Sequence, residues 1–63
     1  MKNKIKELRK AKGLRQEDLA EVLNVTRQTI IAIENNKYDP TLELAMKIST
    51  FFDLSVNDIF SLE

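Results

Sequence analysis

The 63-residue chain contains no cysteine and no histidine, and it has only one glycine and one proline. Without cysteine no disulfide can crosslink the fold, so its stability must come from packing. A zinc site would have to be built from carboxylates alone, which is not a usual zinc ligand set. The histidine and cysteine nucleophile pairs and the glycine-rich phosphate loops of enzymes are missing as well. We therefore expect no metal, no cofactor and no enzymatic activity.

Long hydrophobic runs are also absent. No apolar stretch approaches the ~20 residues of a membrane-spanning helix. We also expect no signal peptide before the domain. A chain of this length is expected to form a single small domain, residues 1–63, without room for a separate domain that binds a small molecule. These features predict a soluble cytoplasmic protein with no membrane contact.

Neither sign of charge dominates, because ten basic and ten acidic residues cancel. The charges are unevenly distributed, however: residues 1–37 carry nine basic and five acidic residues, a net of +4, and residues 38–63 carry a net of −4. A neutral chain is not expected to coat nucleic acid indiscriminately. A polarised chain is compatible with one face meeting phosphates and another meeting solvent or a partner, and an ordinary mixed-charge surface is the alternative.

What the sequence does contain is a succession of short amphipathic helices. Apolar spacing and capping residues predict five helices and no strand, which defines an all-α fold. The expected helices cover about residues 2–12, residues 16–23, residues 26–35 with Thr26 as N-cap, a segment after the cap Thr41 with apolar positions from Leu44 to Phe52, and a short segment after the cap Ser55. Gly13, Asn24 and the pair Asn35–Asn36 stand where left-handed residues would end the first three helices.

The most informative segment is the pair of helices at about residues 16–35. Two short helices joined by a tight turn form a helix-turn-helix, whose second helix places its N-terminal turn in the major groove of DNA. That turn carries Thr26, Arg27, Gln28 and Thr29. Arginine and glutamine can bond bidentately to guanine and adenine, respectively. Since Ile30 and Ile33 form the buried stripe of the same helix, the polar residues should face outward together.

Five segments in a fixed order resemble the Cro/C1-type helix-turn-helix proteins, also called the XRE or phage-repressor family, and above all its small single-domain members. The matching segments are residues 14–20, 25–30, 33–37, 40–45 with Ile48, and 54–60. They cover nearly the whole chain at consistent spacing, which makes the resemblance far more specific than a lone helix-turn-helix pattern. The resemblance implies a five-helix lambda-repressor-like DNA-binding domain with the helix-turn-helix at helices two and three.

The resemblance also implies roles for individual positions. The base-reading residues would be Arg27, Gln28, Thr29 and Ile31. The phosphate-binding residues would be Gln16, Thr26, Asn35 and Lys37, and Gln16 would also steady Gln28. Arg9 and Glu34 match a structural ion pair of the family that ties helix one to the recognition helix.

Three departures from the family pattern bear on these expectations. Asn24 and Asn36 stand where the family often has glycine, but both can adopt the left-handed conformation at a modest cost. Arg15 replaces a Ser or Thr cap, which forfeits a contribution of ~1 kcal/mol and could place a cation near the DNA backbone. Ile31 is not a departure, because the family varies its specificity residues at this position. It lies about 100° around the helix from Ile30, so it either contacts a thymine methyl or is an incidental exposed residue.

Together these patterns predict a sequence-specific transcriptional regulator, a repressor or autoregulator, whose partner is a double-stranded DNA operator. A homodimer would read a pseudo-palindromic operator through successive major grooves about 34 Å apart. Phe51, Phe52 and Phe60 exceed what one small core obviously needs. Most of this aromatic surface is expected in the core, and the rest is expected to join Leu62 and the acidic C-terminal half in a two-fold dimer contact. The alternative is a protein-interaction module, such as an antitoxin or adaptor subunit, that keeps the fold without binding DNA.

Overall fold

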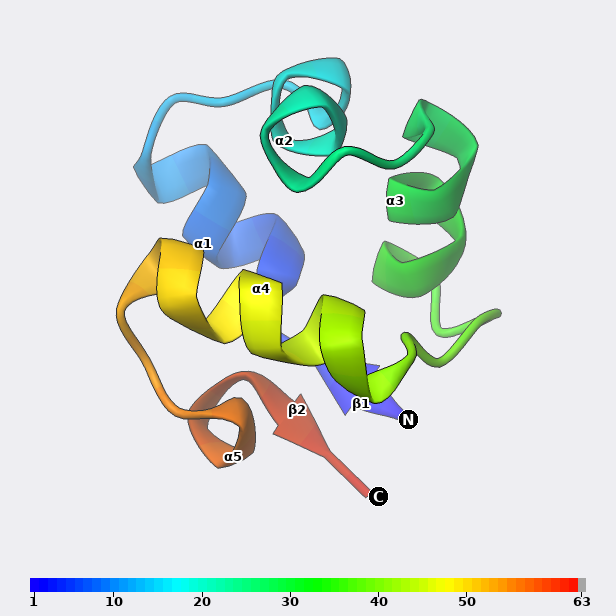
Figure 1. Ribbon diagram of the computed structural model, residues 1–63, viewed down its shortest axis with the longest axis vertical. Coiled ribbons are helices and arrows are strands. Elements are labelled where there is room, and N and C mark those ends of the chain that lie inside the picture. Colours follow the sequence, from blue (N-terminus) through cyan, green and yellow to red (C-terminus); the bar gives the residue numbers. More distant parts are fainter. Residues whose placement is uncertain (63) are drawn as a thin grey trace.

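The computed structural model describes residues 1–62, in which five helices surround one apolar core (Figure 1). The helices are α1 (Ile5–Ala11), α2 (Gln16–Leu23), α3 (Arg27–Glu34), α4 (Leu42–Phe52) and α5 (Val56–Ile59). α4 crosses the middle of the molecule, with α2 and α3 on one side of it and α5 on the other (Figure 1). The predicted five-helix fold is confirmed. No helix within residues 1–62 is long and apolar enough to cross a membrane.

The ends of the helices follow local rules that the sequence contains. Each of the three expected N-caps accepts a hydrogen bond from the backbone three residues later: Thr26 from the Thr29 amide, Thr41 from the Leu44 amide and Ser55 from the Asp58 amide. The chain turns through left-handed backbone at Gly13, Asn24 and Asn36, with φ of 71°, 59° and 60°. A fourth such residue, Asp53 with φ of 56°, ends α4 and was not expected. Asparagine therefore replaces the family's glycines without changing the turns.

The predicted absence of strands is wrong at the two ends of the described chain. Strand β1 (Lys2–Asn3) pairs antiparallel with strand β2 (Phe60–Ser61), and Asn3 lies opposite Phe60. The Lys4 amide extends this pairing by donating to the Ile59 carbonyl at 2.9 Å. Helix one consequently begins at Ile5 rather than at Lys2. Strands of two residues are too short to show an alternating sequence pattern, so periodicity could not reveal them.

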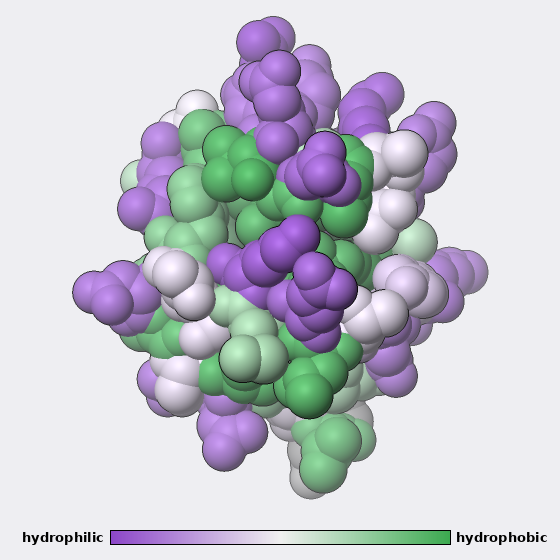
Figure 2. Space-filling model, in the orientation of Figure 1, coloured by the Kyte–Doolittle hydropathy of each residue, from purple (hydrophilic) through white to green (hydrophobic). Residues whose placement is uncertain are grey.

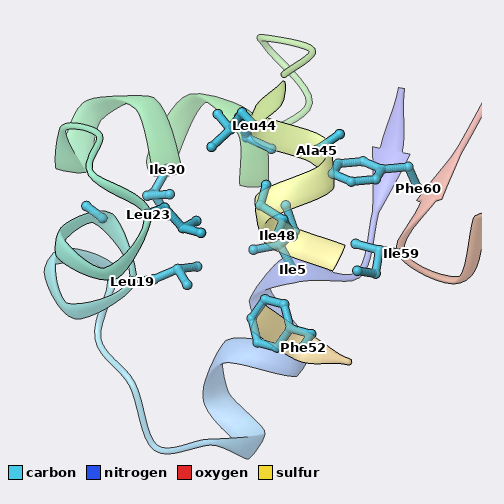
Figure 3. Close-up of a cluster of buried hydrophobic side chains, with 12 residues drawn as sticks. Ile5, Leu19, Leu23, Ile30, Leu44, Ala45, Ile48, Phe52, Ile59 and Phe60 are labelled. Carbon is cyan, nitrogen blue, oxygen red and sulfur yellow. The ribbon is translucent and has the colours of Figure 1, made fainter. Parts of the chain in front are cut away.

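The core draws on all five helices and on β2 (Figure 3). Its fully buried large side chains are Ile5, Leu19, Ile30, Ile33, Ile48 and Ile59. Phe52 and Phe60 are also buried, at 8% and 7% exposure, so neither is a surplus aromatic available for a dimer contact. Phe51 is half-buried and packs edge-on against Phe52, with ring centroids 5.0 Å apart. Phe52 and Phe60 therefore belong to the core, as expected for most of these rings, and Phe51, the partly exposed one, lines a surface groove between α2 and α4. The dimer contact expected for the remaining aromatic surface stays a prediction.

Other apolar side chains remain on the surface and line a groove of about 670 Å³ between α2 and α4. The most exposed of them are Val22, Leu42 and Met46, at 53%, 74% and 57%. Figure 2 shows apolar surface in this region, interrupted by hydrophilic side chains. Glu43 and Lys47 belong to the lining and form an ion pair at 3.7 Å. An exposed apolar groove of this kind is typical of an interaction surface; we call it the α2–α4 groove.

Candidate nucleic-acid interface

The first turn of α3 presents polar side chains to solvent while the opposite face of the helix is buried. Thr26 caps the helix by accepting from the Thr29 amide at 3.2 Å, and the two threonine hydroxyls lie 3.0 Å apart. Arg27 and Gln28 are exposed, whereas Ile30 is only 1% exposed. The cap therefore fixes the backbone from which Arg27 and Gln28 project. The Thr29 hydroxyl, half-buried, is already bonded to Thr26.

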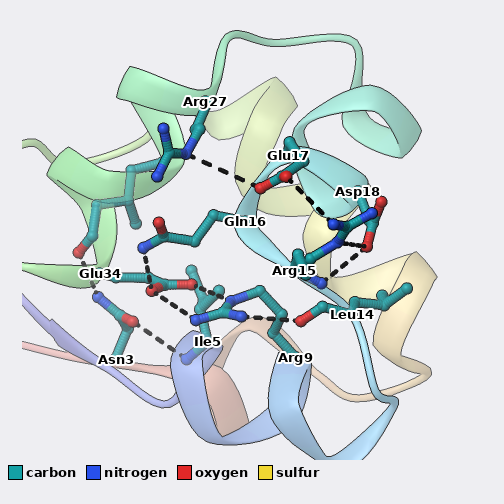
Figure 4. A network of polar contacts seen from close by, with 11 residues as sticks. Asn3, Ile5, Arg9, Leu14, Arg15, Gln16, Glu17, Asp18, Arg27 and Glu34 are labelled. Carbon is teal, nitrogen blue, oxygen red and sulfur yellow. Dashed lines mark hydrogen bonds and ion pairs between the residues drawn. The ribbon is translucent and has the colours of Figure 1, made fainter.

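A buried ion pair joins α1 to the end of α3 (Figure 4). The Arg9 Nε donates to the Glu34 carboxylate at 2.7 Å, and one terminal nitrogen of Arg9 donates to the same carboxylate at 3.3 Å. The other terminal nitrogen donates to the Leu14 carbonyl at 2.8 Å. The two side chains are 8% and 2% exposed, so the predicted ion pair is confirmed as an interior feature. Arg9 thus lies on the inner face of α1 together with Ile5.

Gln16 joins this interior network. Its Nε2 donates to the Glu34 carboxylate at 3.2 Å, which links the first residue of α2 to α3. The expected bond that would steady Gln28 is not made, and the Gln28 side chain has no hydrogen-bond partner within residues 1–62. A carboxylate is a stronger hydrogen-bond acceptor than an amide oxygen, so Gln16 donates to Glu34 rather than to Gln28. The support given to the recognition helix therefore reaches its last residue rather than its first turn.

The start of α2 is held by charged side chains. Arg15 supplies no side-chain cap, as expected, but its amide donates to the Asp18 carboxylate at 2.9 Å. That backbone hydrogen bond, reinforced by the positive charge of Arg15, lowers the pKa of Asp18. The Arg15 guanidinium lies 3.5 Å from Asp18 and 3.8 Å from Glu17. The cation expected to be available to the DNA backbone is thus paired within the protein.

Two side chains that the sequence did not single out contribute to this region. Asn3 of β1 donates to the Ile33 carbonyl at 2.8 Å and accepts from the Ile5 amide at 3.1 Å. It connects the paired chain ends to the C-terminal turn of α3, where it also reaches Asn36 at 3.4 Å. Glu17 lies 3.9 Å from Arg27 (Figure 4). The position of Asn3, two residues before α1, could have marked it as a residue that bonds to the start of that helix. The contact of Asn3 with α3 and the contact of Glu17 with Arg27 could not be predicted from residue spacing.

The remaining candidate residues lie at the other end of α3. Asn35 and Lys37 are exposed, and neither side chain has a hydrogen-bond or ion-pair partner in the described part of the chain. Ile31, in the middle of the helix, is half-buried, and both alternatives for it, a contact with a thymine methyl and an incidental surface residue, stay open. The fold thus places polar groups at both ends of α3. It also holds Gln16 next to α3, through the hydrogen bond from Gln16 to Glu34. This is the arrangement of a helix-turn-helix DNA-binding domain.

Comparison with known families gives the same result. Residues 5–59 match the family described as Helix-turn-helix. The chain belongs to this family, in agreement with the resemblance to the Cro/C1-type proteins. The fold is also that of a solved structure: the restriction-modification controller protein C.AhdI from Aeromonas hydrophila matches with a TM-score of 0.77 at 32% sequence identity, over 89% of this chain and 81% of that chain.

Several similar proteins are transcriptional regulators by name. An uncharacterized HTH-type transcriptional regulator of Methanocaldococcus jannaschii is 59% identical over 63 residues, which is 100% of this chain and 96% of the relative. The uncharacterized HTH-type transcriptional regulator YgzD of Bacillus subtilis is 52% identical over the same shares. The HTH-type transcriptional activator BcrR of Enterococcus faecalis is 40% identical over 92% of this chain but only 28% of its own length. The protein is accordingly an HTH-type transcriptional regulator, a class of non-enzymatic DNA-binding proteins.

Proposed function

We propose that the protein is a homodimeric repressor or autoregulator that binds a pseudo-palindromic DNA operator through α3. The observation that carries this proposal is the division of α3 into two faces. Arg27 and Gln28 are exposed on its capped first turn, while Ile30 and Ile33 are each 1% exposed and hold the helix against the core. A rigidly mounted helix with free arginine and glutamine is suited to reading guanine and adenine in the major groove.

The phosphate contacts are proposed for residues on both sides of this turn. Gln16 uses one Nε2 hydrogen for Glu34, which leaves its second one for a phosphate oxygen. Thr26, Asn35 and Lys37 are exposed at the two ends of α3. Such contacts set the register of the protein on the duplex and carry no sequence information of their own. Thr29 and Ile31 are proposed as secondary base contacts, because both are half-buried and Thr29 is bonded to Thr26.

The homodimer is proposed because a two-fold operator requires two copies of a single recognition helix. The α2–α4 groove and the exposed Leu62, at 95% exposure, are apolar surfaces that self-association would cover. Bound across a promoter, such a dimer would repress by excluding the polymerase. Analytical ultracentrifugation with and without a duplex that carries both half-sites measures the stoichiometry, and a single protomer on that duplex would contradict this part of the proposal.

The test starts with selection of bound sequences from random duplex DNA. A symmetric motif with half-sites one helical turn apart is expected. Arg27→Ala should then weaken binding to the selected operator by about 1–3 kcal/mol and affect random DNA much less. Lys37→Ala should weaken both about equally and reduce the salt dependence by about one counterion. Lys10→Ala, which removes an exposed cation of α1, is the matched control and should change neither.

The second candidate function is a protein-interaction module, favoured by the α2–α4 groove and by the zero net charge. A protein of that kind would not be retained on heparin at low salt and would recover a stable protein partner in a pull-down. Retention on heparin together with a selected operator motif would exclude it.

A further inference from the structure

We infer that Glu17 is a specificity-determining positioning residue, which holds Arg27 for base reading and makes sequence-independent phosphate binding less favourable. The inference rests on the proposed function, since it concerns the same face of the protein. Glu17 is the second residue of α2 and lies at the point where α2 approaches the first turn of α3. One of its carboxylate oxygens is 3.9 Å from the Arg27 Nε, and the other is 3.8 Å from a terminal nitrogen of Arg15 (Figure 4).

Arg27 faces Glu17 with its Nε, which leaves its two terminal amino groups available for other contacts. A guanidinium is planar and carries five N–H donors in a fixed arrangement. Figure 4 shows the Nε of Arg27 toward Glu17 and its two terminal amino groups on the far side of the guanidinium, and these amino groups have no hydrogen-bond partner within residues 1–62. Two parallel N–H donors are what O6 and N7 of guanine accept in the major groove. The ion pair therefore selects, before DNA arrives, orientations in which Arg27 can read guanine.

The stability of the fold does not depend on this contact. The side chains of Glu17, Arg15 and Arg27 are 52%, 76% and 58% exposed. Ion pairs with this exposure contribute little to the free energy of folding. A carboxylate on a DNA-facing surface also opposes the phosphates, so it would weaken binding if affinity alone mattered. The effect of Glu17 on binding is therefore expected in the difference between the affinity for the operator and the affinity for other DNA sequences.

The charge of Glu17 supplies such a difference. Without it, Arg27 would be a free cation beside the recognition helix and could neutralise a phosphate of any sequence, whereas Arg15 would keep its ion pair with Asp18 at 3.5 Å. With it, an arginine that turns toward a phosphate must leave its carboxylate, and the carboxylate repels that phosphate. A guanine contact through the terminal nitrogens keeps the Glu17 pair intact. Specificity is a difference of affinities, and a penalty on the wrong complexes raises it as effectively as a gain on the right one.

The experiment compares Glu17→Gln with Glu21→Gln, which removes the same charge from an exposed position of the same helix that makes no ion pair within residues 1–62. Dissociation constants are measured on the selected operator and on random duplex over a salt series. Glu17→Gln is expected to bind random duplex about threefold to tenfold more tightly at low salt, with a steeper salt dependence. Its ratio of operator to random affinity should fall about tenfold, and that of Glu21→Gln less than twofold.

Two further measurements separate positioning from charge alone. In an Arg27→Ala background, Glu17→Gln should no longer change discrimination between operator and a duplex with 7-deazaguanine at the contacted position, because Glu17 acts on that guanine through Arg27. Thermal unfolding of Glu17→Gln should match the wild type. An unchanged specificity ratio, or an equal change in Glu21→Gln, would overturn the inference. If wild type selects no sequence, the proposed function has failed instead, and the two failures are thereby distinguished.

Discussion

Replacing Glu34 with alanine is expected to remove much of the stability of the protein. The Glu34 side chain is 2% exposed and accepts from both Arg9 and Gln16. Its removal leaves the buried Arg9 guanidinium with one acceptor, the Leu14 carbonyl. Breaking a buried pair by removing one partner costs about 3–5 kcal/mol. A domain of 63 residues has a total stability of about 3–9 kcal/mol, so the variant should be marginally folded at 25 °C.

Urea unfolding followed by far-UV circular dichroism measures this loss. Glu43→Ala is the matched control: Glu43 pairs with Lys47 at 3.7 Å, but it is 82% exposed, so the expected cost is about 0.3–0.5 kcal/mol. The double variant Arg9→Met, Glu34→Leu leaves no unpaired buried charge and should recover most of the stability. A loss below about 1 kcal/mol in Glu34→Ala, or a double variant no more stable than it, would refute the reasoning.

Three further predictions concern the fold. Asn24→Ala should lower the free energy of unfolding by about 1 kcal/mol because Asn24 has φ of 59°, and Asn24→Gly should preserve it; urea unfolding of both compares them. Ile48→Ala should cost about 2–5 kcal/mol because Ile48 is 0% exposed, whereas Met46→Ala at 57% exposure should cost less than about 1 kcal/mol in the same assay. The bond from the Arg15 amide lowers the pKa of Asp18 in the folded state, so the unfolded state binds its proton more tightly. The stability that Asp18 contributes is therefore present above its unfolded pKa and is lost as pH falls through its folded pKa. When the unfolding midpoint is measured at decreasing pH, Asp18→Asn should lose less stability than the wild type below about pH 4. Equal losses in the two proteins would contradict this assignment.

Much of the fold could be predicted from short-range chemistry. A threonine or serine that caps a helix bonds to an amide three residues away, so Thr26, Thr41 and Ser55 could be assigned from sequence. The same holds for the left-handed Asn24 and Asn36, whose conformation depends on the residue type and its immediate neighbours. The exposed first turn of α3 followed from the spacing of Ile30 and Ile33. For the same reason, the order of residues alone was enough to identify Arg27 and Gln28 as candidate base-reading residues.

Contacts between elements were predicted only where the family resemblance supplied them, as for Arg9 and Glu34. The rest required the tertiary structure. The packing of α2 on α3 brings the Gln16 amide nitrogen to 3.2 Å from the Glu34 carboxylate, a bond that the resemblance did not imply. Packing also decides how the three phenylalanines divide between the core, which buries Phe52 and Phe60, and the surface, where Phe51 lines the α2–α4 groove.

The sequence by itself determined the order of the five helices, the caps at which α3, α4 and α5 begin, and the residues that stand on the first turn of the recognition helix. These properties depend on interactions within about one helical turn, which the order of residues specifies directly. The start of α1 at Ile5 and the end of α4 at Asp53 were not among them. Only the tertiary structure decided the pairing of Lys2–Asn3 with Phe60–Ser61, the bond from Asn3 to the end of α3, and the contact of Glu17 with Arg27. Each joins residues ten or more positions apart, whose meeting depends on how the helices pack against one another.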